Sequence, residues 1–261
     1  ERAGWTGRAG GDLPTLDLPT DRPRRAETRR RGAYDWFPLD GTLLAAIGRL
    51  AQREGATRFH VLLSAFLVLL ARHTGQEDLV VGTPTAGRSR REIEGLIGFF
   101  VNNLVLRADL SGDPSFRELL SRVRTMAIEA FAHQDTPFER LVEAVAPERE
   151  LGRNPLFQVL FNHFAVDERL FALPPLELST LDMTLDVSKF DLTLHCFEVE
   201  GQLVVKLEYD TDLFDRETIE ALGRRYLTLL AGVVADPGAR LSRLPLLADA
   251  GRAQLVVQWK R

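Results

Sequence analysis

The sequence is short of cysteine and has no long hydrophobic run. Cys196 is the one cysteine among 261 residues, so no disulfide can form within the chain and nothing implies an oxidising compartment. The longest apolar run, Val61 to Ala71, is interrupted by Ser64 and falls far short of the about 20 residues that span a bilayer. No secretory signal opens the chain, and its first residue is Glu1 instead of Met. We therefore predict a cytoplasmic protein without membrane contact, and a piece of a longer one.

Neither sign of charge dominates the sequence. It has 33 basic and 37 acidic residues, a net charge of −4, which gives no general reason to expect a nucleic acid or a membrane surface as partner. Apolar residues make up 45% and charged residues 27%, the balance of a soluble protein with a proper core. The length allows one large domain or two small ones.

The familiar sequence signatures of active sites are also missing. The sequence has no Gly-rich phosphate loop, no metal-ligand cluster and no Gly-x-Ser-x-Gly elbow, and its five histidines lie far apart. One pair has a suggestive spacing, because His163 and Asp167 form an HxxxD in which the acid could orient the imidazole as a general base. Two residues this common lie four apart by chance more often than they form a catalytic pair. The residues alone therefore predict no catalytic residue and no metal site.

The first 31 residues differ in composition from the rest. Glycine, proline and eight arginines, six of them within residues 22–31, crowd this stretch, and apolar residues do not recur there with a helical or strand period. The arginines could grip phosphate, but no aromatic residues are interleaved to stack on bases. We favour an extended, solvated linker.

After this stretch, helices and strands alternate. The predicted helices are one capped by Asp40 and followed by Gly55, a buried one at about Arg58–His73 that stops at Gly75, one over Pro114–Ala132 capped by Asp113, one opened by a Thr136–Glu139 capping box, and a last one capped by Asp215 and ended by Pro237–Gly238. The predicted strands are Asp78–Gly82, Val101–Arg107, Pro155–Phe164, and a hairpin of Phe190–Val199 with Leu203–Tyr209 that turns at Glu200–Gly201. Residues 82–91 are predicted to form a loop. This order indicates an α/β or α+β sandwich with a mixed sheet covered by helices.

Several longer runs carry a resemblance. They are Leu16–Arg24 (LDLPTDRPR), Val80–Arg88 (VVGTPTAGR), Ile97–Arg107 (IGFFVNNLVLR), His133–Glu139 (HQDTPFE), Arg149–Phe157 (RELGRNPLF, with Gly152 where Ser is usual), Lys189–Leu194 (KFDLTL) and Leu207–Asp215 (LEYDTDLFD). Their sequence and order resemble the condensation domains of nonribosomal peptide synthetases over nearly the whole chain. Leu244–Trp259 resembles the linker toward an adenylation domain.

The resemblance implies a fold and a reaction. The family has two lobes that resemble chloramphenicol acetyltransferase. The amine of an acceptor aminoacyl thioester attacks a donor thioester in a tunnel between the lobes. Both substrates ride on phosphopantetheine arms of carrier domains, so no cofactor is expected to bind the chain directly. The family's catalytic HHxxxDG lies in the N-terminal lobe, and this sequence has none.

The chain therefore resembles a C-terminal lobe that is inactive alone. The expected division is a joint between the lobes at 1–33, the lobe at 34–240 and a linker toward an adenylation domain at 241–261. The expected partners are peptidyl carrier domains, the N-terminal lobe and the adenylation domain. Alternatives are a non-catalytic module that docks a carrier or recruits a partner, or a related epimerase or ester synthase; the intact FVNNLVLR run favours condensation over epimerisation. A missing lobe should leave an apolar face exposed and promote self-association.

The resemblance also marks the candidate site residues, which line the substrate tunnel or lie in family motifs. They are Gly82, Thr83, Pro84, Arg88, Gly98, Val101, Asn102, Asn103, Arg107, His133, Gln134, Asp135, Pro137, Phe138, Glu139, Arg149, Arg153, Asn154, Pro155 and Asp191.

Most of these residues have a structural interpretation beside the functional one. Asn102 and Asn103 either hydrogen-bond a substrate amide or satisfy buried backbone groups. Arg88 either contacts a pantetheine phosphate or is solvated. Asp191 points either at the cleft between the lobes or at solvent.

For the remaining motif residues we favour the structural interpretation. Capping and packing account for His133, Gln134 and Asp135 better than catalysis does. Arg149 and Arg153 are expected to form ion pairs that lock the lobe. Pro84 and Pro155 are expected to fix turns.

Overall fold

The computed structural model describes residues 13–25, 29–145, 152–165, 186–199 and 202–247. Its strands are β1 (Gly32–Pro38), β2 (Asp78–Thr85), β3 (Asn102–Asp109), β4 (Val159–Ala165), β5 (Leu192–Val199) and β6 (Gln202–Asp210). Its helices are α2 (Gly41–Arg53), α3 (Arg58–Thr74), α4 (Arg91–Glu94), α5 (Phe116–Ala132), α6 (Phe138–Val145), α7 (Arg216–Ala235) and the short 3-10 helix η2 (Leu241–Arg243). The predicted alternation of helices and strands is confirmed.

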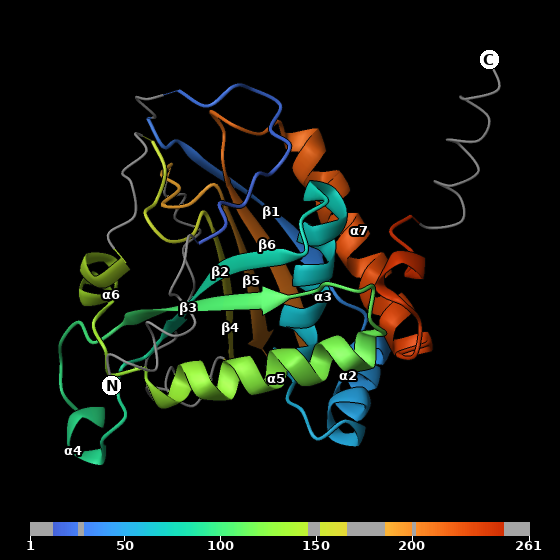
Figure 1. Ribbon diagram of the computed structural model, residues 1–261, viewed down its shortest axis with the longest axis horizontal. Coiled ribbons are helices and arrows are strands. Elements are labelled where there is room, and N and C mark those ends of the chain that lie inside the picture. The colour runs from blue at the N-terminus through green and yellow to red at the C-terminus, as the bar shows by residue number, and fades with distance from the viewer. Residues whose placement is uncertain (1–12, 26–28, 146–151, 166–185, 200–201, 248–261) are drawn as a thin grey trace, which may run out of the picture.

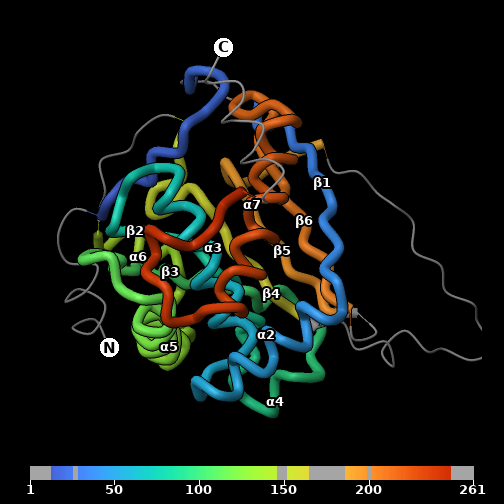
Figure 2. The backbone as a smooth tube through the Cα atoms, turned by 90° about the vertical axis from the view of Figure 1, so that its right-hand side faces the viewer, coloured from blue at the N-terminus to red at the C-terminus, as the bar shows by residue number. Residues whose placement is uncertain are grey.

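The strands form one mixed sheet in the order β1-β6-β5-β4-β2-β3. Strand β4 runs parallel to β2 and β5, and the other neighbours are antiparallel. The predicted hairpin is the β5–β6 pair, in which Leu194 lies opposite Leu207; its turn at residues 200–201 lies outside the described residues. Figure 2 shows β1 along the edge of the sheet that lies farthest from β3.

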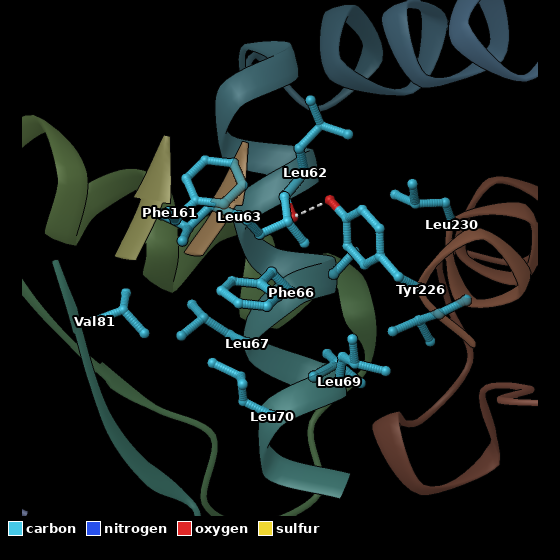
Figure 3. Close-up of a cluster of buried hydrophobic side chains, with 14 of the residues drawn as sticks. Leu62, Leu63, Phe66, Leu67, Leu69, Leu70, Val81, Phe161, Tyr226 and Leu230 are labelled. Carbon is cyan, nitrogen blue, oxygen red and sulfur yellow. Dashed lines mark hydrogen bonds between the residues drawn. The ribbon is translucent and has the colours of Figure 1, made fainter. Parts of the chain in front are cut away.

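One face of the sheet is covered by α2, α3, α5 and α7 (Figure 1). Helix α3 is the centre of this layer, since every residue from His60 to Leu70 is buried. Figure 3 shows α3 between Tyr226 of α7 and the strand residues Val81 and Phe161. The Tyr226 hydroxyl donates to the carbonyl of Leu62 at 2.9 Å, so the one polar group of this ring is satisfied inside the core. The predicted buried helix is confirmed.

Three helix ends test the residues predicted to begin or end a helix: Asp40 and Gly75 are confirmed, and Asp113 is wrong. Asp40 caps α2 by accepting from the amide of Thr42 at 2.6 Å, and Gly75 ends α3 with a φ of 73°. Helix α5 begins at Phe116, after a capping box of Ser115 and Glu118. The predicted cap at Asp113 is wrong, because its carboxylate instead accepts from the amide and hydroxyl of Ser242.

The opposite face of the sheet is covered only in part. Helix α6 packs there on a second, smaller apolar cluster, whose buried members are Val80, Val105, Leu141, Leu156, Phe157 and Leu160. Among the described residues, no helix covers the continuation of this face over the ends of β4, β5, β6 and β1. The described part of the chain therefore has one complete helical layer and one incomplete layer.

The two ends of the described chain pack on the lobe. The Leu16 side chain is 3% exposed, and its amide donates to Oε1 of Gln158 at 3.1 Å. Leu241 and Leu244 are buried in the main core. The linker predicted to be solvated thus contacts the lobe at Leu16 while many of residues 13–25 stay exposed, and the core continues past residue 240. The predicted division into joint, lobe and linker stays a prediction.

Candidate functional site

The GTPTAGR motif continues β2 past the end predicted for it. Thr83 is buried and Pro84 lies in the strand opposite Asn103, so the prediction that Pro84 fixes a turn is wrong. A Cβ atom on Gly82 would lie 2.1 Å from Cε2 of Phe157. Glycine at this position therefore lets the Phe157 ring cross the strand and anchor the smaller apolar cluster.

Arg88, at the end of the same motif, holds a loop together. Its guanidinium donates to the carbonyls of Ile93 and Glu94 and lies 4.5 Å from the centre of the Phe100 ring. Gly87 precedes it with a φ of 63°, and a Cβ there would lie 1.9 Å from the Phe100 carbonyl oxygen. The Arg88 side chain is therefore held within the protein instead of being freely solvated, and the predicted phosphate contact stays a prediction.

The loop that Arg88 holds exposes apolar side chains. Ile97 and Phe99 are fully or almost fully exposed, at 105% and 90%, and Leu96 and Val101 are about half exposed. This loop projects from the body together with α4 (Figure 1). Gly98 lies at its tip, where a Cβ would lie 2.9 Å from the Phe100 ring. We call residues 96–101 the apolar loop.

Asn102 fastens the turn between α5 and α6 to the start of β3. Its Nδ2 donates to the carbonyls of Gln134 and Thr136, at 2.9 and 2.7 Å, and its Oδ1 accepts from the Phe138 amide at 3.1 Å. These contacts agree with the structural interpretation of Asn102, in which its side chain satisfies backbone groups. The Thr136 amide donates to the His133 carbonyl at 3.1 Å instead of to the Glu139 carboxylate, so the predicted reciprocal Thr136–Glu139 capping box does not form.

The rest of the HQDTPFE motif is tied to β2 and the loop after it. Gln134 accepts from the Thr85 hydroxyl at 2.6 Å, and Asp135 accepts from the Ser89 hydroxyl at 2.9 Å. The Phe138 ring packs edge-on against Phe157. These hydrogen bonds and this ring contact are structural, which is the role that we favour for the motif over catalysis. The remaining members, His133, Pro137 and Glu139, lie in the turn or on the first turn of α6, and Asn103 makes no side-chain hydrogen bond to the described residues.

Asp191 forms an ion pair with the segment between the predicted lobes. Its carboxylate accepts two hydrogen bonds from Arg24, with side chains 10% and 18% exposed. The buried Asp210 lies next to this pair, and burial, together with the neighbouring Asp212 and Asp191, raises the pKa of its carboxyl. The predicted orientation toward solvent is wrong, because the buried Asp191 pairs with Arg24, and the predicted orientation toward the cleft stays a prediction.

The other charged candidates are also structural or lie outside the described residues. Arg107 forms a bidentate pair with Asp78, at 2.8 and 3.0 Å, and Arg153 lies 3.8 Å from Asp17. Arg149 lies outside the described residues. The side-chain amide Nδ2 of Asn154 donates to the carbonyl of Lys189, and Pro155 lies in the bends before β4.

The structure adds a feature that the sequence did not single out. Polar and aromatic side chains share the part of the sheet that no described helix covers; they are Tyr34, Trp36, Asn162, Phe164, His195, Phe197, Lys206 and Glu208. We call this set the open face. The alternation along β5 was the available signal, since it placed His195 and Phe197 opposite the core residues, but it did not reveal their neighbours on other strands.

The candidate histidine of the HxxxD lies on the helical side instead. His163 Nε2 is 2.9 Å from Glu198, whose other oxygen is 2.5 Å from Arg58. These contacts join β4, β5 and the start of α3, and Asp167 lies outside the described residues. Within the described ranges, no three His, Cys, Asp or Glu side chains are placed to hold a metal ion.

Comparison with known proteins decides the family. The model of the family described as "Condensation domain" matches residues 1–256. The chain belongs to the condensation-domain family. Condensation domains form amide bonds in nonribosomal peptide synthetases, which make secondary metabolites. The chain is 48% identical to part of a linear gramicidin synthase of Brevibacillus parabrevis and 47% identical to part of chondramide synthase of Chondromyces crocatus. These matches cover 98% and 95% of the chain but only 5% and 6% of the relatives, so the chain spans about a twentieth of their length.

Solved structures give the same fold. The four-domain synthetase holo-AB3403 superposes with a TM-score of 0.87 at 26% identity, over 95% of this chain and 20% of that one. The X-domain in the complex with OxyB from teicoplanin biosynthesis superposes with a TM-score of 0.86 at 31% identity, over 95% and 55%. The mixed sheet with its helical layer is thus a lobe of the chloramphenicol-acetyltransferase-like fold. In the described part of the chain no single helix qualifies as a membrane span; α2 and α3 qualify only as a pair bent by 104°.

Proposed function

We propose that this condensation-family chain forms one lobe of a two-lobed domain that joins two carrier-bound aminoacyl or peptidyl thioesters through an amide bond. In this proposal the second lobe lies upstream and supplies the HHxxxDG histidine, which this sequence lacks. The chain alone is therefore inactive. Residues 1–33 join the lobes, and residues 241–261 lead toward an adenylation domain.

The apolar loop is the observation that carries this proposal. Ile97 and Phe99 belong to a family motif, yet their side chains lie in solvent at 105% and 90% exposure. Apolar side chains so exposed are expected to be covered in the working protein. The incomplete covering of the sheet on the side of α6 points the same way. A second lobe would cover the apolar loop and leave the uncovered sheet face as one wall of the tunnel between the lobes.

The family also supports the substrates and partners of the proposal. The relatives that match are parts of peptide synthetases, in which condensation domains work with carrier and adenylation domains. We propose that carrier domains present both thioesters on phosphopantetheine and that the chain binds no cofactor of its own. We place the reaction in the cytoplasm, with which the single buried thiol of Cys196 is compatible.

Reconstitution tests the proposal. The chain is tested with carrier-loaded donor and acceptor, first alone and then extended upstream by its second lobe. We expect peptide from the extended protein and none from the chain. Peptide from the isolated chain would show that it holds its own catalytic group. If an extended protein with intact HHxxxDG forms no peptide, amide formation is ruled out.

A second candidate function is recruitment of a partner enzyme. The X-domain from teicoplanin biosynthesis, which superposes on 95% of this chain, was solved in complex with OxyB. A lobe of this kind can therefore belong to a domain that binds another protein. The upstream sequence separates the two functions, since a second lobe without HHxxxDG favours recruitment over catalysis.

A further inference from the structure

Aromatic rings converge at the centre of the open face. The Phe197 ring is 4.6 Å from that of Phe164, 5.6 Å from that of Trp36 and 5.7 Å from that of His195. These spacings are typical of attractive aromatic pairs. Trp36 is 48% exposed and Phe164 38% exposed, so both present ring surface to solvent. A further ring can extend this cluster.

A carboxylate without a hydrogen bond lies beside the rings. Nδ2 of Asn162 lies 3.3 Å from Nδ1 of His195, which joins the two side chains across β4 and β5. Nε2 of His195 is 3.7 Å from Oε2 of Glu208, too far for a hydrogen bond. Glu208 makes no hydrogen bond to any described residue, and its side chain is 26% exposed. Within the described ranges both of its oxygens can therefore accept from a ligand.

The cation of the open face lies over the rings of β1. Nζ of Lys206 lies 4.0 Å from the centre of the Tyr34 ring and 5.3 Å from that of Trp36. Both rings belong to β1, whereas Oε2 of Glu208 faces His195 on β5. The β5 side of the open face thus combines aromatic surface with a negative charge.

We propose that the open face binds the acceptor aminoacyl group and favours an aromatic side chain on it. The substrate ring packs against Phe197 and the exposed rings of Trp36 and Phe164, and its α-ammonium donates to Glu208. An acceptor carries this free ammonium, whereas the nitrogen of a peptidyl donor is acylated, so the charge distinguishes the acceptor from a peptidyl donor. The inference rests on the proposed function and gives its acceptor a chemical class.

Binding to the chain itself tests both parts of the inference. The probes are N-acetylcysteamine thioesters of phenylalanine, of N-acetylphenylalanine, which lacks the ammonium, and of glycine, which lacks the ring. We expect calorimetry to give a Kd for the phenylalanine probe at least about tenfold lower than for the other two. Equal affinity for all three probes would overturn the inference.

Two variants separate the ring from the charge. Phe197→Ala should remove the preference over the glycine probe, and Glu208→Gln should remove the preference over the N-acetyl probe. Glu217→Gln, an exposed glutamate on α7, is the matched charge control and should change neither. Phe197→Leu keeps the packing volume if the alanine variant unfolds, and it should lose the same preference. Variants that bind all probes as the parent does would contradict the assigned residues.

A rate measurement distinguishes failure of this inference from failure of the proposed function. The two-lobed protein is given phenylalanyl or glycyl acceptor carriers and one donor. If neither acceptor yields peptide, the proposed function fails. If both react equally fast, with and without Phe197→Ala, amide formation stands and the aromatic acceptor is refuted. A KM advantage for the phenylalanyl acceptor that Phe197→Ala abolishes supports both.

Discussion

The neighbouring residues Asn102 and Asn103 provide a sharp test of how the motif works. Asn102→Ala removes three hydrogen bonds and leaves two carbonyls and one amide unpaired in a partly buried turn. At about 1 kcal/mol for each net hydrogen bond, the free energy of unfolding should fall by roughly 3 kcal/mol. Asn103→Ala removes no side-chain hydrogen bond to the described residues, so it should change that free energy by less than about 0.5 kcal/mol.

Urea unfolding measures this difference. With an m-value of about 3 kcal/mol/M, the midpoint for Asn102→Ala should fall by about 1 M, while that for Asn103→Ala stays near the parent value. Hydrogen exchange gives a local reading, because the Phe138 amide loses its acceptor only in Asn102→Ala. Equal midpoints and equal Phe138 exchange in the two variants would refute the assignment of Asn102 as the residue that fastens this turn.

Three further perturbations follow from other contacts. Gly82→Ala places a Cβ 2.1 Å from the Phe157 ring and should destabilise the protein by about 2–3 kcal/mol; adding Phe157→Leu should restore part of this in urea midpoints, and no restoration would contradict the clash. Asp191→Asn should lower the free energy of unfolding by about 3–5 kcal/mol, because it leaves the charge of Arg24 without its carboxylate. Arg24→Gln should lower this free energy much less in the Asp191→Asn protein than in the parent. Burial lowers the pKa of His60 and His73, so the unfolded chain takes up protons first as the pH falls below 6.5; thermal stability should drop from pH 7 to pH 5, by at most about 1.4 kcal/mol per histidine and pH unit, and a flat profile would contradict neutral histidines in the fold.

The sequence predicted the elements well where one pattern is strong. The buried helix, the hairpin and the cap at Asp40 follow from local periodicity and spacing, and the structure has them. The start of α5 was misplaced because Asp113 and Pro114 form a plausible cap in isolation, while the carboxylate is in fact taken by Ser242, more than a hundred residues later. Local rules do not contain such a competitor.

The candidate site shows the same limit more clearly. The motifs identified the family, but they did not reveal that Arg88 closes its own loop or that Asp191 is covered by Arg24. Both are charged residues whose partners are fixed by tertiary contacts. The open face draws on four strands, so its composition follows only from the strand order β1-β6-β5-β4. The alternation along one strand shows which of its side chains share a face, but it does not show which strands lie beside it.

The ion pairs of the segment before β1 have a consequence for exchanging lobes between synthetases. Arg22 pairs with Asp215 and Arg24 with Asp191, so this segment belongs mechanically to the lobe that follows it. A chimera joined inside residues 16–24 would combine an arginine from one parent with an aspartate from another. A junction upstream of Leu16 keeps each arginine with the carboxylate it folded against, and any rigid swing between lobes would then pivot before that leucine.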